Sequence, residues 1–157
     1  MASIWRVELT ATHKQVTLIT QSLLQELTSP TLSSESIENL NFGTTTKVVF
    51  AGFLRMGKFT VKNAQVTDNS RTFEYTHLTR SDITFANDEL HAVLQLKRSK
   101  ADMEHRGIDI VFAATGSTTC PVRALRTLFD RQPLQGDQPL FGFDGGPLHH
   151  DWMIATL

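Results

Sequence analysis

Arg55 is the residue of this sequence whose surroundings best suit the binding of an anion. It follows the most apolar run of the chain, Val48 to Leu54, and the segment Met56 to Thr60 comes directly after it. A guanidinium at the point where a buried segment reaches the surface is well placed to hold a negatively charged group. The alternative is purely structural, because a cation near a helix C-terminus interacts favourably with the helix dipole, by about 0.3–1 kcal/mol.

A second group of cations lies in one short turn between two predicted strands. Within residues 97–106 the chain carries Lys97, Arg98, Lys100 and Arg106. A hairpin tip with these cations can contact a nucleic acid, because backbone phosphates are bound mainly by Lys and Arg. Charged residues also belong on any solvated hairpin, so the structural reading stays open.

The overall charge is close to neutral, unlike that of a strongly basic nucleic-acid-binding protein. The chain has 15 Lys and Arg against 16 Asp and Glu, and its pI is about 6.6. Only the middle third is net positive, since residues 55–106 hold nine cations and seven anions. Any contact with nucleic acid is therefore expected in that third.

Length, cysteine content and hydropathy are typical of one soluble domain inside the cell. The 157 residues can bury a core, and Cys120, the single cysteine, has no partner for an internal disulfide. No apolar run approaches the ~20 residues that cross a membrane. The first residues also lack the basic and then apolar order of a secretory signal. We expect an intracellular protein without a membrane contact.

Two helices are predicted before Arg55. Residues 16–27 have one apolar helical face, formed by Leu18, Ile19, Ser22, Leu23 and Leu27. A second helix is predicted over residues 39–54, and because Val48 to Leu54 is apolar all round, it is expected at the centre of the core. Residues 62–81 are polar and rich in turn formers, which predicts a loop or two short strands.

Three short strands follow, at residues 82–85, 91–98 and 107–112. In the second strand Ala92 and Leu94 alternate with outward positions, as in a half-buried strand. The expected fold class is therefore α+β. A mainly helical core would carry a three-stranded antiparallel sheet at one edge, and this sheet would present the cationic turn.

The last third of the chain predicts two more helices. The first begins at Pro121 and has a buried stripe of Val122, Leu125, Leu128 and Phe129. Cys120 is expected to be a small core residue beside the cap. Residues 132–146 form a turn-rich connection, and residues 149–152 open the last helix, with His150 or Asp151 expected as its cap.

Four features occur in a characteristic order: Gly52–Gly57, Leu78–Ile83, Leu94–Asp102, and Cys120–Leu125 followed by Pro139–Phe141. This order resembles the tyrosine recombinases, also called phage-type integrases, including the transposon-borne members of eukaryotes. There the features are the first arginine box, the entry to the first strand, the catalytic-lysine hairpin, and the next helix with its connection. The resemblance covers residues 44–157 and leaves residues 1–43 as a helical lead-in segment.

The resemblance implies DNA cleavage and rejoining through a phosphotyrosyl intermediate, without a metal or nucleotide cofactor. Arg55 would be the first of two arginines that clamp the scissile phosphate, through a bidentate fork. Lys100 would donate a proton to the leaving oxygen, and Lys97 is the alternative for that role. The expected DNA contacts are Lys97, Arg98, Arg106, Lys58 and Arg80.

The sequence also departs from the family pattern. Tyr75 is the only tyrosine, and it precedes the hairpin instead of following a second arginine box. Neither His149 nor His150 has an arginine three positions later. Lys58 stands where members usually carry a carboxylate, and since burying an unpaired ammonium is costly we expect it to point outward or toward DNA. Tyr75 is then more simply a packing aromatic.

The expectation is thus an inactive DNA-binding fragment, truncated before the second arginine and the nucleophile, and nuclear if the source is a eukaryote. Its partners would be DNA and further copies of itself, because absent helices would leave apolar faces uncovered. The alternative is a small interaction or structural domain without a nucleic-acid role. A metal site at His149, His150 and Asp151 is not expected, since adjacent helical residues point in different directions.

Overall fold

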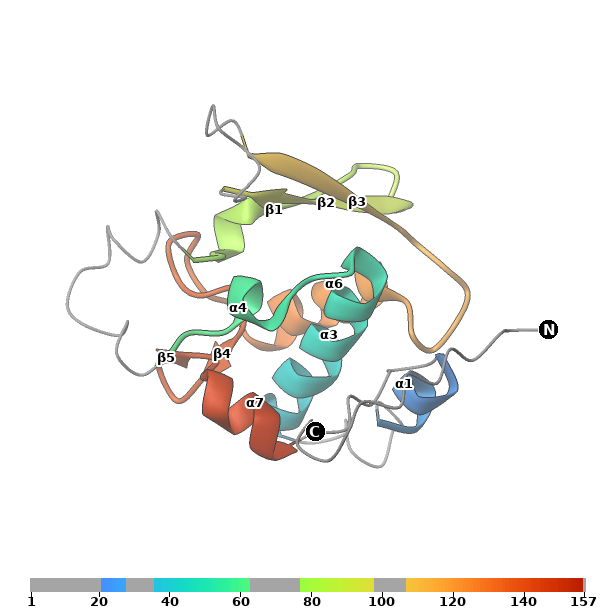
Figure 1. The fold of residues 1–157 in the computed structure, drawn as a ribbon. Helices are drawn as coiled ribbons and strands as arrows, with labels where there is room; N and C mark the ends of the chain where they lie inside the picture. Colours follow the sequence, from blue (N-terminus) through green and yellow to red (C-terminus); the bar gives the residue numbers. More distant parts are fainter. Residues whose placement is uncertain (1–20, 28–35, 63–76, 98–106, 157) are drawn as a thin grey trace.

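The computed structural model describes residues 21–27, 36–62, 77–97 and 107–156 (Figure 1). The helical elements are α1 Gln21–Leu27, α3 Ile37–Gly52, α4 Met56–Phe59, the short 3-10 helix η2 Arg80–Asp82, α6 Pro121–Arg131 and α7 His150–Thr156. The strands are β1 Ile83–Phe85, β2 His91–Leu96, β3 Ile108–Ala113, β4 Gly142–Phe143 and β5 Gly146–Pro147. The predicted α+β class is confirmed at this level.

The first three strands form an antiparallel sheet in the order β1-β2-β3. Leu94 lies at its centre, opposite Ile83 on one side and Ile110 on the other. Ala92, Leu94 and Leu96 are buried while Gln95 is exposed, so the predicted alternation is confirmed. The sheet covers the ends of α3 and α6 (Figure 1). Beyond Lys97, the predicted cationic turn lies outside the described residues.

Helix α3 is the central element, in contact with α6, β3, β4 and α1. It starts two residues earlier than predicted, because the Ser36 hydroxyl caps it by accepting the Asn39 N–H at 3.0 Å. The apolar run is not buried all round: Val48 is buried, but Ala51 and Phe53 are exposed. The helix instead buries its first half, from Leu40 to Thr46, which is partly polar.

Helix α6 follows the sequence pattern closely. Cys120 is its N-cap and Pro121 its first residue, where a missing N–H costs no helical hydrogen bond. Val122, Leu125 and Leu128 are fully buried against α3, which confirms the predicted stripe. Phe129, the fourth member, is only partly buried.

The described part of the first predicted helix is α1, in which the burial of only one predicted face residue, Ser22, is described. Leu24 is buried, whereas Ser22, assigned to the apolar face, is exposed. Residues 16–20 of that prediction lie outside the described residues. No helix in the described ranges is long and apolar enough to cross a bilayer.

The connection after α6 contains a small hairpin that the sequence pattern did not reveal. Strands β4 and β5 pair through Phe143 and Gly146, and Asp144-Gly145 forms the two-residue loop with positive φ values of 51° and 76°. An Asp-Gly loop with both φ positive is a type I′ turn, the usual closure of a tight hairpin. The Asp-Gly pair was the available signal.

A buried polar network joins α3 to this hairpin. The Asn41 Oδ1 accepts the Gly142 N–H at 2.9 Å, and its Nδ2 donates to the Ile37 carbonyl at 2.9 Å and to the Gln132 Oε1 at 3.0 Å. The Gln132 Nε2 in turn donates to the Gly142 carbonyl at 3.0 Å. Because Asn41 is fully buried, these bonds compensate its desolvation.

Candidate functional site

The turn between α3 and α4 presents Arg55. Phe53 ends α3 in the left-handed region, at φ 49° and ψ 39°, and its N–H donates to the Val49 carbonyl. Leu54 also donates to that carbonyl, at 3.0 Å. Arg55 then returns to extended backbone, and its carbonyl accepts the Lys58 N–H at 2.8 Å to open α4. Arg55 therefore occupies the junction of two helices.

Close packing of α3 on the sheet explains why the turn has this form. A Cβ added at Gly52 would lie 3.1 Å from the Phe112 ring, so any other residue would require that ring to shift by a few tenths of an ångström. Glycine is also the usual residue for a left-handed helix end. In this sequence the glycine, Gly52, lies at the position that packs against β3, so the next position, in the left-handed region, is occupied by Phe53.

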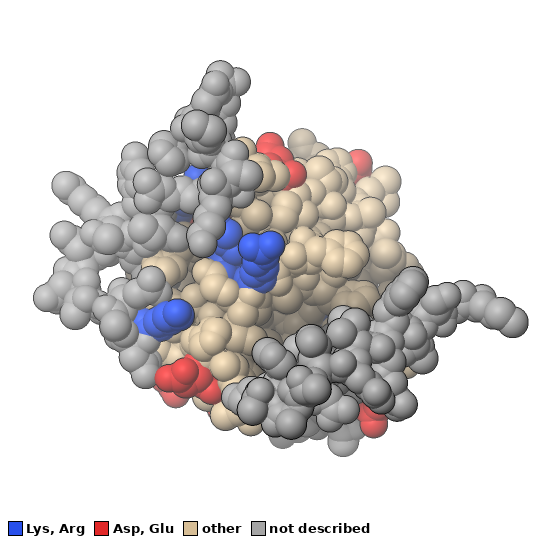
Figure 2. Space-filling view, in the orientation of Figure 1, with Lys and Arg blue, Asp and Glu red and all other residues tan. Residues whose placement is uncertain are grey.

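The Arg55 side chain is exposed, and the described part of the chain gives its guanidinium no hydrogen bond or ion pair. Two further cations follow, Lys58 on α4 and the exposed Lys62. Figure 2 shows Lys and Arg atoms near the centre of this face, around α4, whereas the Asp and Glu atoms lie at its periphery. Among the described residues in this view, no Asp or Glu atoms adjoin the central Lys and Arg atoms, although acidic atoms lie close to the Lys and Arg atoms at the left.

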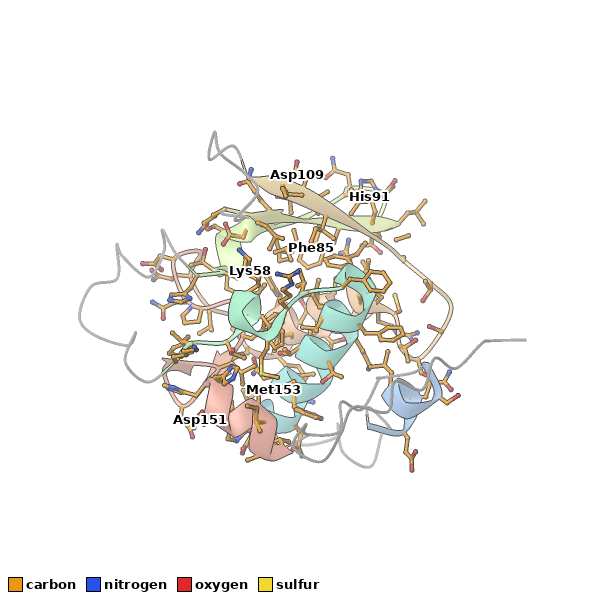
Figure 3. All side chains as sticks on the ribbon, in the orientation of Figure 1. Lys58, Phe85, His91, Asp109, Asp151 and Met153 are labelled. Atoms are coloured by element: carbon orange, nitrogen blue, oxygen red, sulfur yellow. The ribbon has the colours of Figure 1, made fainter. Side chains whose placement is uncertain are left out.

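Lys58, on α4, is half-buried (Figure 3). It was expected to point outward or toward DNA, and only part of the residue is exposed. It borders a hollow of about 10 Å³, with these other lining residues: Phe59, Val61, His77, Leu78, Pro139, Leu140, Phe141 and Pro147. Burial lowers the pKa of His77 from its ordinary value, which keeps its ring neutral at neutral pH. The hollow is the size of one water molecule.

Arg80, predicted as a DNA contact, lies inside the protein. Only 3% of the residue is exposed, its Nη2 donates to the Gln132 Oε1 at 2.9 Å, and its guanidinium carbon lies 4.4 Å from the centre of the Phe129 ring. Its Nε and Nη1 atoms are buried without a hydrogen-bond partner. Burial lowers the pKa of Arg80 to about 10. In this position the guanidinium is out of reach of a DNA backbone.

Replacing Arg80 with methionine should therefore not destabilise the fold. We expect the free energy of unfolding to stay within about 1 kcal/mol or to rise, because the change removes a buried unpaired cation and fills the space with an apolar chain. The Gln132 Oε1 would keep its hydrogen bond from Asn41. Urea denaturation measures the effect, with exposed Arg131→Met as control. A loss above about 2 kcal/mol would show that the Gln132 bond and the Phe129 stacking outweigh desolvation.

Lys97, predicted as a DNA contact and as an alternative proton donor, is bound inward. Its Nζ lies 2.9 Å from the Asp82 Oδ2 and donates to the Thr79 Oγ1 at 3.2 Å. The Lys97 side chain is 25% exposed and that of Asp82 only 3%. A lysine held by a buried carboxylate is a structural cation. Lys100, the other candidate proton donor, lies outside the described residues together with Arg98 and Arg106, so its role stays a prediction.

Cys120 is more than a small core residue. Its Sγ accepts the N–H groups of Thr115 at 3.3 Å and Arg123 at 3.5 Å. Burial raises the pKa of the thiol, but these backbone hydrogen bonds outweigh it and lower the pKa below the ordinary value. Burial and the nearby Arg123 charge likewise lower the pKa of Lys47. The Cys120 sulfur therefore acts as the cap of α6. Because the residue is buried, the sulfur does not reach solvent.

Helix α7 begins beside two histidines and an aspartate, His149, His150 and Asp151. The described ranges contain no group of three or more His, Cys, Asp or Glu side chains close enough to hold an ion. The helix starts at His150, and the His149 carbonyl accepts the Met153 N–H at 3.1 Å, so neither predicted cap precedes the helix. The His150 Nδ1 instead lies 3.3 Å from the Thr60 Oγ1.

Of the predicted site residues that the structure describes, Arg55 is exposed, Lys58 and Lys97 are half-buried, and Arg80 is buried. Tyr75 lies outside the described residues. Comparisons with known protein families, with curated proteins and with solved structures find no match for this chain. The function is therefore inferred from its own residues and their geometry.

Proposed function

We propose that this protein binds DNA through its sugar-phosphate backbone, with Arg55 as the principal phosphate contact. The observation that carries the proposal is the charge of the segments around Arg55. From Asn39 to Lys62 the described residues include four Lys or Arg and no Asp or Glu. Arg55 is exposed among them, without a side-chain partner in the described ranges.

An exposed guanidinium is suited to this role for two reasons. It offers parallel N–H donors that match two phosphate oxygens, and it loses little hydration before it binds. Lys58 and Lys62 would add electrostatic attraction without sequence preference. Because the net charge of the chain is −1, the attraction is local and should fall steeply with salt.

The recombinase resemblance supports a more specific form of the proposal, in which Arg55 and Lys100 are inherited catalytic positions. Strand cleavage of that kind needs a tyrosine nucleophile after a second arginine. The single tyrosine of this sequence, Tyr75, precedes the hairpin that carries Lys100. The function proposed for this chain is therefore binding, without formation of the covalent intermediate.

The test is fluorescence anisotropy of a labelled DNA duplex at several salt concentrations. We expect a dissociation constant of about micromolar or weaker, and a slope of log Kobs against log salt that Arg55→Ala reduces by about 0.9, as for one lost phosphate contact. Arg55→Lys should restore the slope but not the full affinity, because a lysine cannot form the fork.

Arg131→Ala is the matched control, because it removes one exposed arginine from the end of α6 and changes the net charge equally. It should leave the salt slope unchanged.

No binding at low salt would refute the proposal and favour the alternative, a small interaction or structural domain. If Arg55→Ala and Arg131→Ala changed the DNA affinity and its salt slope equally, the binding would be due to overall charge and Arg55 would have no special role. Sedimentation of the same samples would reveal self-association.

A further inference from the structure

Phe53 is the most exposed large hydrophobic residue in the described ranges. Its exposed fraction is 91%, against 64% for Leu90 and Val111. The residue ends α3 and is separated from Arg55 only by Leu54. A single exposed apolar residue is ordinary on a protein surface, but here an almost fully exposed aromatic ring lies two positions before an exposed arginine, whose guanidinium has no hydrogen bond or ion pair among the described residues.

The backbone of Phe53 makes this exposure more informative. Its φ of 49° lies in the left-handed region, which is unfavourable for a bulky side chain and favoured by glycine or asparagine. The fold gains no buried area from the ring and bears the conformational strain as well. Packing of α3 on the sheet accounts for the left-handed backbone but not for an exposed phenyl ring at that position, which is a reason to look for a function of the side chain.

The surrounding charge indicates what the ring contacts. The described residues from Asn39 to Lys62, which include Phe53, carry four Lys or Arg and no carboxylate. This local charge favours an anionic partner over a cationic one. Single-stranded nucleic acid offers both required groups, phosphates for the cation and flat bases for the ring. Stacking also accepts any base, because every base has a π-face.

We propose that Phe53 stacks on an unpaired base of the DNA strand whose phosphate Arg55 holds. The inference rests on the proposed function and adds a preference for single-stranded, nicked or distorted DNA. The left-handed turn directs the ring to solvent, and Arg55 two residues later binds the backbone of the same nucleotide or its neighbour. One turn thus supplies a charge contact and a stacking contact.

The test compares a labelled single-stranded oligonucleotide with an abasic oligonucleotide of the same length. The wild-type protein should bind the normal strand about tenfold more tightly, the usual size of one stacked base. Phe53→Ala should abolish this preference and leave abasic binding unchanged. Arg55→Ala should weaken binding of both strands equally. Phe53→Trp should keep the preference, with indole fluorescence quenched by the normal strand only, after subtraction of the wild-type signal from Trp5 and Trp152.

Phe53→Gly separates binding from folding. Glycine relieves the left-handed strain, so the melting temperature should hold or rise by about 2–4 °C while the preference for the normal strand is lost. If the wild-type protein binds both strands equally, this inference fails and the proposed function stands. If it binds neither strand nor a duplex, both fail. If Phe53→Ala changes only the sedimentation coefficient, the ring contacts another protein copy and the inference is overturned.

Discussion

Replacing Asp82 with alanine should lower the free energy of unfolding by about 3 kcal/mol, since removing one partner of a buried ion pair leaves the other charge uncompensated. The Asp82 Oδ2 accepts the Thr79 N–H at 2.7 Å and the Thr79 hydroxyl at 3.0 Å, and lies 2.9 Å from the Lys97 Nζ. The carboxylate therefore joins the start of η2 to the end of β2. Urea denaturation followed by circular dichroism measures the loss.

A second Lys or Arg to carboxylate pair among the described residues provides a matched control. Glu89 lies 3.4 Å from Arg126, but its side chain is 75% exposed. Glu89→Ala should cost about 0.5 kcal/mol or less, because exposed pairs are hydrated and screened. A similar loss for both variants would contradict the role assigned to Asp82.

A double variant resolves charge from packing at the same place. Asp82→Leu combined with Lys97→Met removes both charges and should recover part of the stability lost by Asp82→Ala. It would leave the Thr79 N–H and hydroxyl without their acceptor, so full recovery is not expected. Recovery with unchanged DNA affinity would also agree with a structural role for Lys97.

Replacing Asn41 with leucine should lower the free energy of unfolding by about 2–4 kcal/mol, because each buried polar group left without a partner costs about 1–3 kcal/mol. Leucine has a similar size but cannot accept the Gly142 N–H or donate to Gln132. The β4–β5 hairpin would then lose its attachment to α3. Thermal and urea denaturation both report the change.

Asn39→Leu is the control for Asn41, since it makes the same replacement two residues earlier on α3. The Asn39 side chain is exposed, and only its backbone N–H takes part in the Ser36 cap. Its effect should stay within about 0.5 kcal/mol. If Asn41→Leu cost no more than this, Gly142 would be satisfied by solvent and the buried network would be unimportant for stability.

Local sequence patterns predicted the sheet and α6 because each has a strong, short-range signal. Alternation places Ala92 and Leu94 on one side of β2, and Pro121 with the Val122 stripe defines α6. These features depend on neighbours within a few residues. The Asp144-Gly145 hairpin carried an equally local signal and could have been predicted.

The limits of α3 could not be predicted in the same way. An apolar run from Val48 to Leu54 indicates burial, but Gly52 ends the helix where its backbone meets the Phe112 ring. That contact joins residues 60 positions apart, and no local pattern reports it. The polar first half of the helix is buried because Asn41 finds partners in Gln132 and Gly142.

The sequence by itself determined the α+β class, the three-stranded sheet and the presence of Arg55 beside an apolar segment. Only the tertiary structure decided which cations reach the surface. Arg80 and Lys97 look as available as Arg55 in the sequence, yet Arg80 lies on Phe129 and Lys97 pairs with Asp82. The physical reason is that a charge is buried or exposed according to distant groups that solvate it, whereas helices and strands arise from near neighbours.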